Sequence, residues 1–356
     1  MVYRANAQQM AGRAIDSENR VTFRIKAPGA REVKIINLSD EQAMGAREYA
    51  LSLGADSIWT VTTHPCRPGF HYYELSIDGF RCADPGSLLY FGWAKWTSAV
   101  EIPDPVLDFY LPRQVPHGHV RQHWYWSEIT ANYRKCLVYT PPGYDRDLQT
   151  RYPVLFLQHG SGESELGWTM QGKANFILDN LIAGGDAVPM LIVMDNGYAA
   201  RPGAENPAQV RGADNRFADL VVNELVPLID RDFRTIGNRE NRAIAGLSMG
   251  AGQALQIGLA HPELFSSIGA FSGGSRSFDV QTSYSGVFAD AARFNKQYRL
   301  FWMGCGALDG GYAAATAMHE SLENHEIRHV WYPGPGSHEW QVWRRHLHEF
   351  ALLLFR

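Results

Sequence analysis

The sequence lacks several features that would each point to a particular class of protein. Its four cysteines include no C-x-x-C pair, the spacing typical of zinc sites, so we expect no zinc site. We expect no other cofactor. The formal net charge of −4 provides no basic surface for nucleic acid. No apolar run reaches the roughly 18 residues that a membrane-spanning helix needs. We therefore expect neither nucleic acid nor a membrane as a partner.

The N-terminal residues also lack the apolar core of a signal peptide. Residues 5–7, Ala-Asn-Ala, have the small-x-small form that precedes a cleavage site. We expect a secreted or periplasmic protein whose signal peptide is absent from this chain, with a cytoplasmic location as the alternative. Cys66 and Cys82 either form a disulfide or are both free thiols, and we favour free thiols.

The length of 356 residues predicts two domains, at about 150 residues each. Before residue 105, apolar residues alternate with polar ones, which is typical of half-buried strands. The alternation appears in three places: Val21, Phe23 and Ile25; Val33 and Ile35; Tyr73, Leu75 and Ile77. Strands without intervening helices predict a small all-β sandwich of immunoglobulin type over residues 1–105.

An aromatic cluster, Tyr90, Phe91, Trp93 and Trp96, closes this predicted domain. Aromatic rings can stack on sugar rings, so the cluster is a candidate platform for polysaccharide. It is equally an apolar patch that docks the sandwich onto its neighbour, and we favour docking.

Residues 106–118 are predicted to be an extended linker, and residues 119–356 a second domain. Segments 119–127 and 133–140 resemble an antiparallel pair of strands. Buried strands then alternate with amphipathic helices, which indicates a mostly parallel sheet covered on both faces. We expect these strands at 154–158, 190–194, 243–247, 267–271, 300–304 and 329–332. In such a sheet the ligand crevice lies at the carboxyl ends of the strands.

Residues 242–260 organise this second domain. They predict a buried strand, a sharp turn at Ser248 and a helix of small residues. Gly246 and Gly250 complete a G-x-S-x-G pattern, in which glycine permits the close backbone approach of a strand that turns at once into a helix. The turn exposes the serine hydroxyl at a helix N-terminus, where developing negative charge is favoured. Ser248 is therefore our candidate nucleophile.

A serine hydroxyl needs a neighbouring base, and the base needs an orienting carboxylate. Where a serine on such a turn is the nucleophile, the acid and then the histidine follow it along the chain. Asp309 and His338 follow two later strands and fit this order. Asp309 is alternatively a helix N-cap, with Asp279 or Asp290 as the acid, and His338 is alternatively a surface histidine.

The negative charge of an ester-cleavage intermediate needs two backbone N–H donors. Met249, directly after the serine, is one candidate. Ser161, in the small-residue loop after the first buried strand of the parallel region, is the other. His159 begins that loop, and we expect it to be structural.

Two tryptophans, Trp168 and Trp340, flank the proposed crevice and are candidates for an aromatic substrate wall, although a core position is nearly as well supported. The loop 197–216 is a candidate pocket rim. That loop also carries three arginines, Arg201, Arg211 and Arg216. They are compatible with a basic crevice, which would suit a polyanionic substrate.

Several motifs in the same order resemble carbohydrate esterase family 1, a group of esterase-D-like enzymes that contains feruloyl and acetylxylan esterases. They are His159-Gly160-Ser161-Gly162-Glu163, Trp168, Asp179-Asn180-Leu181-Ile182-Ala183, Gly246-Leu247-Ser248-Met249-Gly250 and Gly336-Ser337-His338-Glu339-Trp340. The resemblance covers residues 119–356, and the N-terminal part more loosely resembles family 48 carbohydrate-binding domains. It implies an α/β-hydrolase fold, no metal and a triad of Ser248, Asp309 and His338. Relatives often have a further glycine where this chain has Ser161.

We therefore expect a serine esterase of plant cell-wall polysaccharides, acting as a feruloyl esterase that releases hydroxycinnamates from arabinoxylan. The alternatives are an acetylxylan esterase, then a siderophore esterase, then a carbohydrate-binding protein without catalytic activity. The expected partner is a polysaccharide or a small aryl ester.

Overall fold

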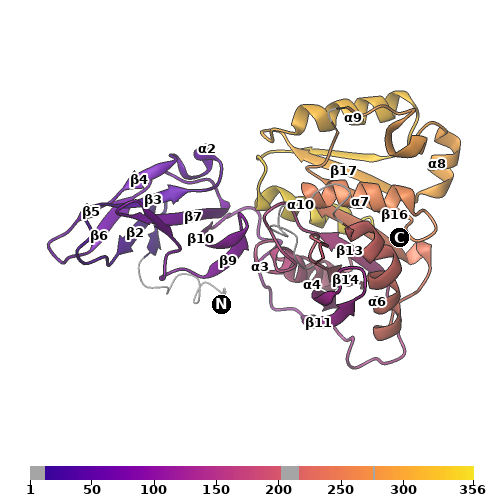
Figure 1. The fold of residues 1–356 in the computed structure, drawn as a ribbon, viewed down its shortest axis with the longest axis horizontal. Coiled ribbons are helices and arrows are strands. Elements are labelled where there is room, and N and C mark those ends of the chain that lie inside the picture. The colour runs from indigo at the N-terminus through magenta and orange to yellow at the C-terminus, as the bar shows by residue number, and fades with distance from the viewer. Residues whose placement is uncertain (1–12, 202–215, 276) are drawn as a thin grey trace. The chain divides into compact units, whose positions relative to one another are not determined.

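The computed structural model describes residues 13–201, 216–275 and 277–356, and the chain divides into two compact units (Figure 1). The first unit comprises Met1–Arg113 together with Glu339–Gln341. The second comprises Gln114–His338 and Val342–Arg356. The division after Arg113 falls inside the segment 106–118.

From Arg13 to Arg113, the first unit contains two antiparallel sheets and one short helix. One sheet has the strand order β1-β2-β6-β5, and the other has the order β4-β3-β7-β10-β9 with β8 paired to β7. The elements are β1 (Arg13–Ile15), β2 (Val21–Ile25), β3 (Val33–Asn37), α2 (Glu41–Met44), β4 (Glu48–Ala50), β5 (Ser52–Leu53), β6 (Trp59–Thr62), β7 (Gly69–Ile77), β8 (Phe80–Cys82), β9 (Leu89–Gly92) and β10 (Lys95–Ile102). The predicted all-β sandwich is confirmed.

Strand alternation builds the core of this unit. β2 buries Val21, Phe23 and Ile25 and turns the residues between them outward. β3 does the same with Val33 and Ile35. All five side chains belong to one hydrophobic cluster. Because successive side chains of a strand point to opposite faces, the period-two pattern correctly identified the inward face.

The aromatic cluster of the first unit lies on the hairpin β9–β10. Trp93 and Ala94 form its tip with φ angles of 57° and 60°, as a tight two-residue hairpin turn requires. Trp93 and Trp96 are exposed, and the Trp96 ring packs edge-on against Phe91 at 5.6 Å between centroids. Sugar stacking and docking both remain predictions for this cluster.

All four cysteines are free thiols, so the disulfide considered for Cys66 and Cys82 is not formed. Cys66 is buried, and Cys82 is only partly so. Burial raises the pKa of both thiols above the ordinary value, which keeps them protonated at neutral pH.

An eight-stranded sheet with the order β11-β12-β14-β13-β15-β16-β17-β18 organises the second unit. β11, β12 and β14 pair antiparallel, and the strands from β14 to β18 pair parallel. The strands are β11 (His119–Ser127), β12 (Asn132–Thr140), β13 (Val154–Gln158), β14 (Leu191–Met194), β15 (Arg242–Leu247), β16 (Ser267–Phe271), β17 (Leu300–Gly306) and β18 (Val330–Gly334). The predicted antiparallel pair and mostly parallel sheet are confirmed.

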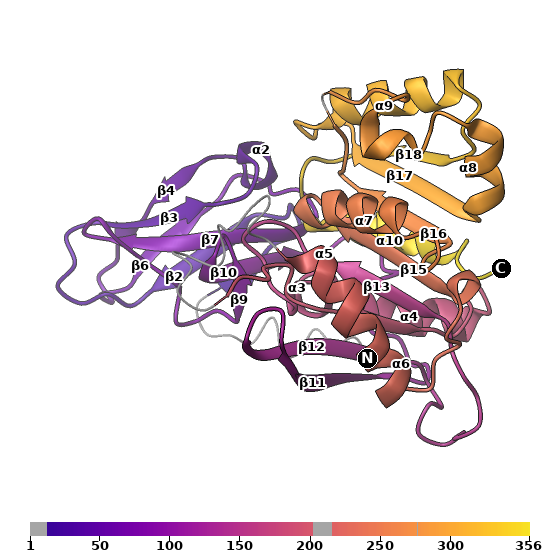
Figure 2. The ribbon, with the colours of Figure 1, turned by 45° about the vertical axis from the view of Figure 1, so that its right-hand side comes forward.

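Helices cover both faces of this sheet. In Figure 2, α5, α6 and α7 lie on the near face, and α4 and α10 lie behind the strands. The helical segments are α3 (Gly167–Met170), α4 (Ala174–Gly184), α5 (Phe217–Leu220), the π-helical η3 (Val221–Leu225), α6 (Val226–Asp232), the 3₁₀ turn η4 (Arg239–Asn241), α7 (Met249–Ala260), the 3₁₀ turn η5 (Ser283–Gly286), α8 (Ala291–Gln297), α9 (Tyr312–Asn324) and α10 (Trp340–Ala351). The helices therefore hide both faces of the central parallel strands, β13 to β17, from water, whereas the edge strand β11 stays largely exposed.

Adjacent residues of β16 show how the two faces are filled. Ala270 belongs to the hydrophobic cluster that includes Leu255 of α7. The next residue, Phe271, points to the opposite face and packs its ring against Phe350 of α10, with centroids 5.7 Å apart. Trp302 of β17 contacts the same Phe271 ring at 5.2 Å. Phe271 thus lies at the centre of the aromatic core beneath α10.

The motif that begins at Asp179 has a structural explanation. Asp179 lies on α4 and is buried. Its carboxylate accepts hydrogen bonds from the Gly118 backbone N–H at 2.9 Å and the Tyr139 hydroxyl at 2.7 Å, and it contacts His117 at 2.8 Å. One buried carboxylate therefore ties the entry of β11 and the end of β12 to α4.

Replacing the central aromatic residue of this core should destabilise the second unit. Phe271→Ala removes a fully buried ring and leaves a cavity among Trp168, Trp302 and Phe350, so we expect the free energy of unfolding to fall by about 3–5 kcal/mol. Urea unfolding followed by far-UV circular dichroism measures the change. Leu148→Ala, at an exposed position, is the control and should stay within about 0.5 kcal/mol of the parent. Similar losses in both variants would contradict the assignment of Phe271 to the core.

Candidate active site

Ser248 lies on a sharp turn between β15 and α7. Its φ and ψ angles are 53° and −113°, a conformation that non-glycine residues rarely adopt. The Ser248 N–H donates to the Phe271 carbonyl oxygen at the end of β16 at 2.9 Å, which helps hold the strained backbone in place. The predicted turn is therefore present, and it projects Ser248 at the carboxyl edge of the sheet.

The two glycines of the pattern are required by close backbone contacts. A Cβ on Gly246 would lie 2.5 Å from the Gly250 carbonyl oxygen, and a Cβ on Gly250 would lie 2.5 Å from the His159 carbonyl oxygen. Any side chain at either position would therefore push the turn away from the neighbouring strand. These contacts are the physical reason for the G-x-S-x-G spacing.

The structure brings Ser248, Asp309 and His338 into one hydrogen-bonded row. His338 Nε2 lies 2.9 Å from Ser248 Oγ, and His338 Nδ1 lies 2.7 Å from Asp309 Oδ2. The histidine side chain is 45% exposed, whereas that of Asp309 is 4% exposed. An imidazole in this position can take the hydroxyl proton of Ser248 while the carboxylate stabilises the resulting imidazolium.

Asp309 is held as an acceptor by its surroundings. Its burial acts to raise its pKa, but the hydrogen bond and charge of His338 and the Gly311 N–H outweigh that effect and lower the pKa below its ordinary value. Gly311, which precedes α9, donates to Oδ1 at 2.8 Å. Asp309 therefore serves the start of α9 and contacts His338 at the same time. The alternative acids are elsewhere engaged: Asp290 caps α8, and Asp279 accepts N–H donors of its own exposed turn.

Backbone hydrogen bonds join the loops that carry the acid and the histidine. Ala307 N–H donates to the Gly334 carbonyl oxygen at 2.7 Å, and Leu308 N–H donates to that of Gly336 at 2.9 Å. The pairing of β17 with β18 thus continues past the strand ends. Asp309 and His338 are consequently placed by one rigid extension of the sheet rather than by two independent loops.

Sequence reasoning missed Trp343 and Ser272 at this site. The Trp343 ring of α10 packs edge-on against the His338 ring at 4.9 Å, and its indole N–H donates to Ser272 Oγ at 3.0 Å. Ser272 follows β16 with a φ of 52°. No local signal marks Trp343, which is one of several apolar residues along α10. Ser272 could have been found from its place at the carboxyl end of a parallel strand.

The loop after β13 approaches Ser248 closely. A Cβ on Gly160 would lie 2.5 Å from Leu247 Cδ1 and 3.5 Å from Ser248 Cβ, so the loop backbone runs directly beside the turn at Ser248. Ser161 is the next residue, so its backbone N–H stays a candidate donor to an oxyanion formed at Ser248. Met249 is the first residue of α7, so the helix offers its N–H no acceptor four residues earlier. The roles of both N–H groups remain predictions.

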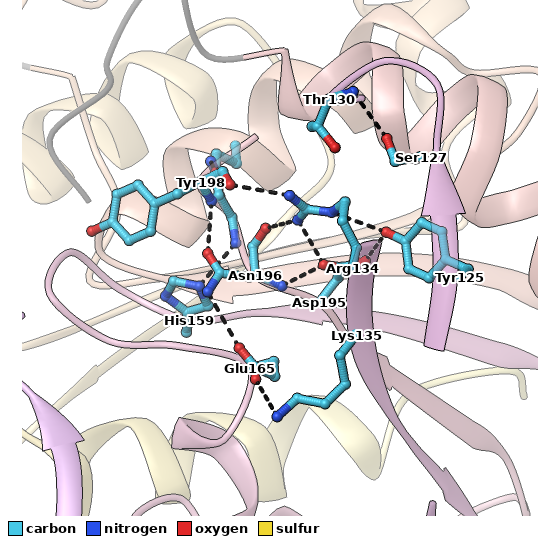
Figure 3. Close-up of polar contacts among 12 residues, drawn as sticks. Tyr125, Ser127, Thr130, Arg134, Lys135, His159, Glu165, Asp195, Asn196 and Tyr198 are labelled. Atoms are coloured by element: carbon cyan, nitrogen blue, oxygen red, sulfur yellow. Dashed lines mark hydrogen bonds and ion pairs between the residues drawn. The ribbon is translucent and has the colours of Figure 1, made fainter. Parts of the chain in front are cut away.

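His159 is buried and joins two neighbouring loops (Figure 3). Its Nε2 accepts the Gly197 backbone N–H at 2.9 Å, and its Nδ1 lies 2.8 Å from the Gly160 carbonyl oxygen. This pattern defines a neutral ring protonated on Nδ1. Burial lowers the pKa of His159 to about 4, consistent with the neutral form at pH 7. These contacts give His159 the structural role expected from the sequence.

The two tryptophans named as a substrate wall have packing roles in the structure. Trp168 is buried, donates its indole N–H to the Gln158 carbonyl oxygen at 2.8 Å and contacts Phe271. Trp340 is buried as well and is grouped with the first compact unit. Neither ring offers an open face to a substrate, because burial on this scale leaves no room for one. We therefore leave both out of the proposed site.

Only part of the predicted rim loop can be described. Arg201 donates through Nε to the Ile129 carbonyl oxygen at 3.3 Å, and Arg216 immediately precedes α5. Arg211 lies outside the described residues. Within the described ranges, no group of three metal-binding side chains occurs, and no helix is both long and apolar enough to cross a bilayer.

Residues 127–353 match the family model described as "Putative esterase". This match covers more than half of the chain. The chain belongs to the esterase family. The esterase is 36% identical over 349 residues to an endo-1,4-beta-xylanase/feruloyl esterase of Xylanibacter ruminicola, over 96% of this chain and 46% of that protein. It is 33% identical over 123 residues to an esterase of Mycobacterium tuberculosis, over 34% of this chain and 25% of that protein. The chain thus spans less than half of the length of these curated relatives.

Solved structures agree with this assignment. The esterase resembles a CE1 ferulic acid esterase from Anaeromyces mucronatus at 27% identity and a TM-score of 0.61, over 71% of this chain and 96% of that one. It also resembles an enterobactin esterase from Shigella flexneri at 18% identity and a TM-score of 0.69, over 99% of both chains, a likeness that shows the fold alone. The resemblance to carbohydrate esterase family 1, the α/β-hydrolase fold and an esterase enzyme are thereby confirmed.

Burial of a neutral histidine should make the esterase less stable in acid. The pKa of His159 is about 4 in the folded chain against 6.5 ordinarily, so between pH 6.5 and 4 only the unfolded chain takes up this proton. The free energy of unfolding therefore falls as the pH is lowered through this range. His159→Gln keeps an acceptor for Gly197 but does not titrate. Its deficit in stability relative to the parent should shrink by about 1.4 kcal/mol per pH unit across this range, measured by urea unfolding at several pH values. A deficit independent of pH would contradict the prediction.

Proposed function

We propose that this esterase is a serine carboxylic-ester hydrolase of plant cell-wall polysaccharides that releases hydroxycinnamates from arabinoxylan. The observation that carries the proposal is the position of His338, within hydrogen-bonding distance of both Ser248 and Asp309. Nucleophile, base and orienting acid are the three groups that acyl transfer from an ester requires.

In the proposed first step, His338 Nε2 takes the Ser248 proton as Oγ attacks the ester carbonyl carbon. A bond forms between Oγ and this carbon, and the carbonyl electrons move to its oxygen. The Met249 and Ser161 N–H groups stabilise that oxyanion at the N-terminus of α7. When the carbonyl reforms, His338 gives its proton to the departing sugar oxygen, and the acyl group stays on Ser248.

The second step repeats the same chemistry with water. His338 removes a proton from water, the resulting hydroxide attacks the acyl carbon, and Ser248 leaves as an alcohol with the proton from His338. Asp309 remains ionised throughout, in keeping with its lowered pKa. The products are the hydroxycinnamic acid and the free polysaccharide hydroxyl.

The substrate class is supported by the relative from Xylanibacter ruminicola, whose name joins a xylanase with a feruloyl esterase. Glycoside cleavage ordinarily uses two carboxyl groups on either side of the bond, whereas Ser248, His338 and Asp309 form an acyl-transfer site. Of the two activities in that name, the geometry therefore favours ester cleavage for this chain.

Replacing the nucleophile or the acid should abolish ester cleavage without unfolding the chain. We expect Ser248→Ala to lower kcat on methyl ferulate by more than about 10⁴-fold and Asp309→Asn by about 10³–10⁴-fold, because the first loses the attacking oxygen and the second loses the charge that orients and stabilises His338. Spectrophotometric release of ferulate measures both. Asp279→Asn, at the exposed alternative acid, is the matched control and should keep the parent rate. An undiminished rate in Ser248→Ala would refute the proposal and return the chain to the carbohydrate-binding alternative.

Parallel assays of the parent enzyme separate the candidate substrates. Higher kcat/KM on feruloylated arabinoxylan than on acetylated xylan supports the feruloyl assignment. The reverse order assigns the chain to acetylxylan esterases. Preference for a catecholate siderophore ester over both would replace the polysaccharide with a siderophore as substrate.

A further inference from the structure

The short loop that follows β14 is unusually well ordered by side chains. Its three backbone N–H groups each have an acceptor: Asn196 N–H donates to Asp195 Oδ1 at 2.5 Å, Gly197 N–H to His159 Nε2 at 2.9 Å, and Tyr198 N–H to Asn196 Oδ1 at 3.0 Å. None of these acceptors belongs to a helix or a strand ladder. The loop therefore owes its shape to particular side chains.

The carbonyl groups of the same three residues are also satisfied. Gln253 on α7 donates through Nε2 to the Gly197 oxygen at 2.9 Å. Arg134 on β12 donates through Nη1 to the Tyr198 oxygen at 3.1 Å and through Nη2 to the Asn196 oxygen. A loop with every backbone group engaged has few other conformations available to it.

Arg134 is itself fixed from the other side. Its Nη2 contacts Asp195 Oδ1 at 2.8 Å, and its Nε donates to the Tyr125 hydroxyl at 3.2 Å, which in turn donates to Asp195 Oδ2 (Figure 3). All three side chains are nearly inaccessible to water. A buried ion pair is favourable only in a geometry that satisfies its remaining hydrogen bonds, so this one holds the guanidinium in a single orientation.

Tyr198 connects the loop after β14 to the loop beside Ser248. Its hydroxyl accepts the Gly162 backbone N–H at 2.7 Å, and its ring lies 5.7 Å from that of His159. The loop from His159 to Gly162 is thus attached to the loop after β14 at both of its ends. Between those two attachments lies Ser161, the predicted second oxyanion donor.

We propose that Tyr198 is a positioning residue for the oxyanion-binding loop, acting through its hydroxyl on Gly162. The inference rests on the proposed function. With Gly162 N–H directed at Tyr198, the preceding peptide groups can present N–H donors toward Ser248. The buried ion pair of Arg134 and Asp195 keeps the loop after β14 rigid, and the Tyr198 hydroxyl holds Gly162 against that loop.

Such a residue affects the transition state more than the bound substrate. Oxyanion donors act on charge that develops only during attack, so misplacing them lowers kcat and leaves KM nearly unchanged. Displacements of about 1 Å are enough to reduce rates by about 10²-fold. Tyr198 itself touches no reacting atom, which separates it from the three side chains of the proposed triad.

Tyr198→Phe tests the inference, because it removes the acceptor of Gly162 N–H and keeps the ring. We expect kcat on methyl ferulate to fall by about 10- to 100-fold with KM changed by less than about twofold. The inhibition constant of an arylboronic acid, which forms a negatively charged tetrahedral adduct on serine, should rise by a similar factor. Titration of active sites with a fluorophosphonate gives kcat per competent site, so partial unfolding does not imitate the effect.

Tyr144→Phe is the matched control. The Tyr144 hydroxyl also accepts a backbone N–H, that of Arg234 at 3.0 Å, but it follows the end of β12 at the opposite edge of the sheet. The Tyr144→Phe variant should lose thermal stability as Tyr198→Phe does, and it should keep the parent kcat per titrated site.

A parent-like kcat and boronate affinity per site in Tyr198→Phe would overturn the inference, as would equal losses in both variants. Either result leaves the proposed function standing as long as Ser248→Ala is inactive. Activity in Ser248→Ala would instead remove the proposed function itself.

Discussion

The strained turn at Ser248 is the constraint on which the second unit depends. A φ of 53° is unfavourable for serine, and the turn persists because the backbone around it is packed without space for side chains. Gly246 meets Gly250, Gly250 meets the end of β13, and Gly160 meets Leu247. The same contacts that force the hydroxyl outward bring the loop after β13 within reach of it. The strain at Ser248 and the outward direction of its side chain therefore have one origin.

Around this turn, loops at the carboxyl ends of neighbouring strands are joined in pairs. The loops after β17 and β18 share backbone hydrogen bonds and place Asp309 against His338. The loops after β13 and β14 share His159 and Tyr198. One pair carries the proposed base and acid, and the other carries the loop proposed to bind the oxyanion. Each pair is rigid because two adjacent strands of a parallel sheet support it.

Burial sets the charge state of the groups in these pairs. Asp309 is buried but receives a histidine and a backbone N–H, so its pKa falls and it stays ionised. His159 is buried without a charged partner in direct contact, so its pKa falls and it stays neutral. A carboxylate and an imidazole thus respond to the same dry environment according to the partners they contact.

Alternation, glycine spacing and chain order are local properties, so the strands of the large sheet, the turn at Ser248 and the order of serine, acid and histidine could be predicted from the sequence alone. The pairing of Asp309 with His338, while Asp279 and Asp290 serve their own turns, depends on which loops become neighbours in the folded chain, so it could not be predicted in this way. The tertiary structure likewise buried Trp168, named from sequence as a substrate contact, and joined Tyr198 to Gly162. Burial and contacts between distant residues arise from strand order and packing, which no local pattern encodes.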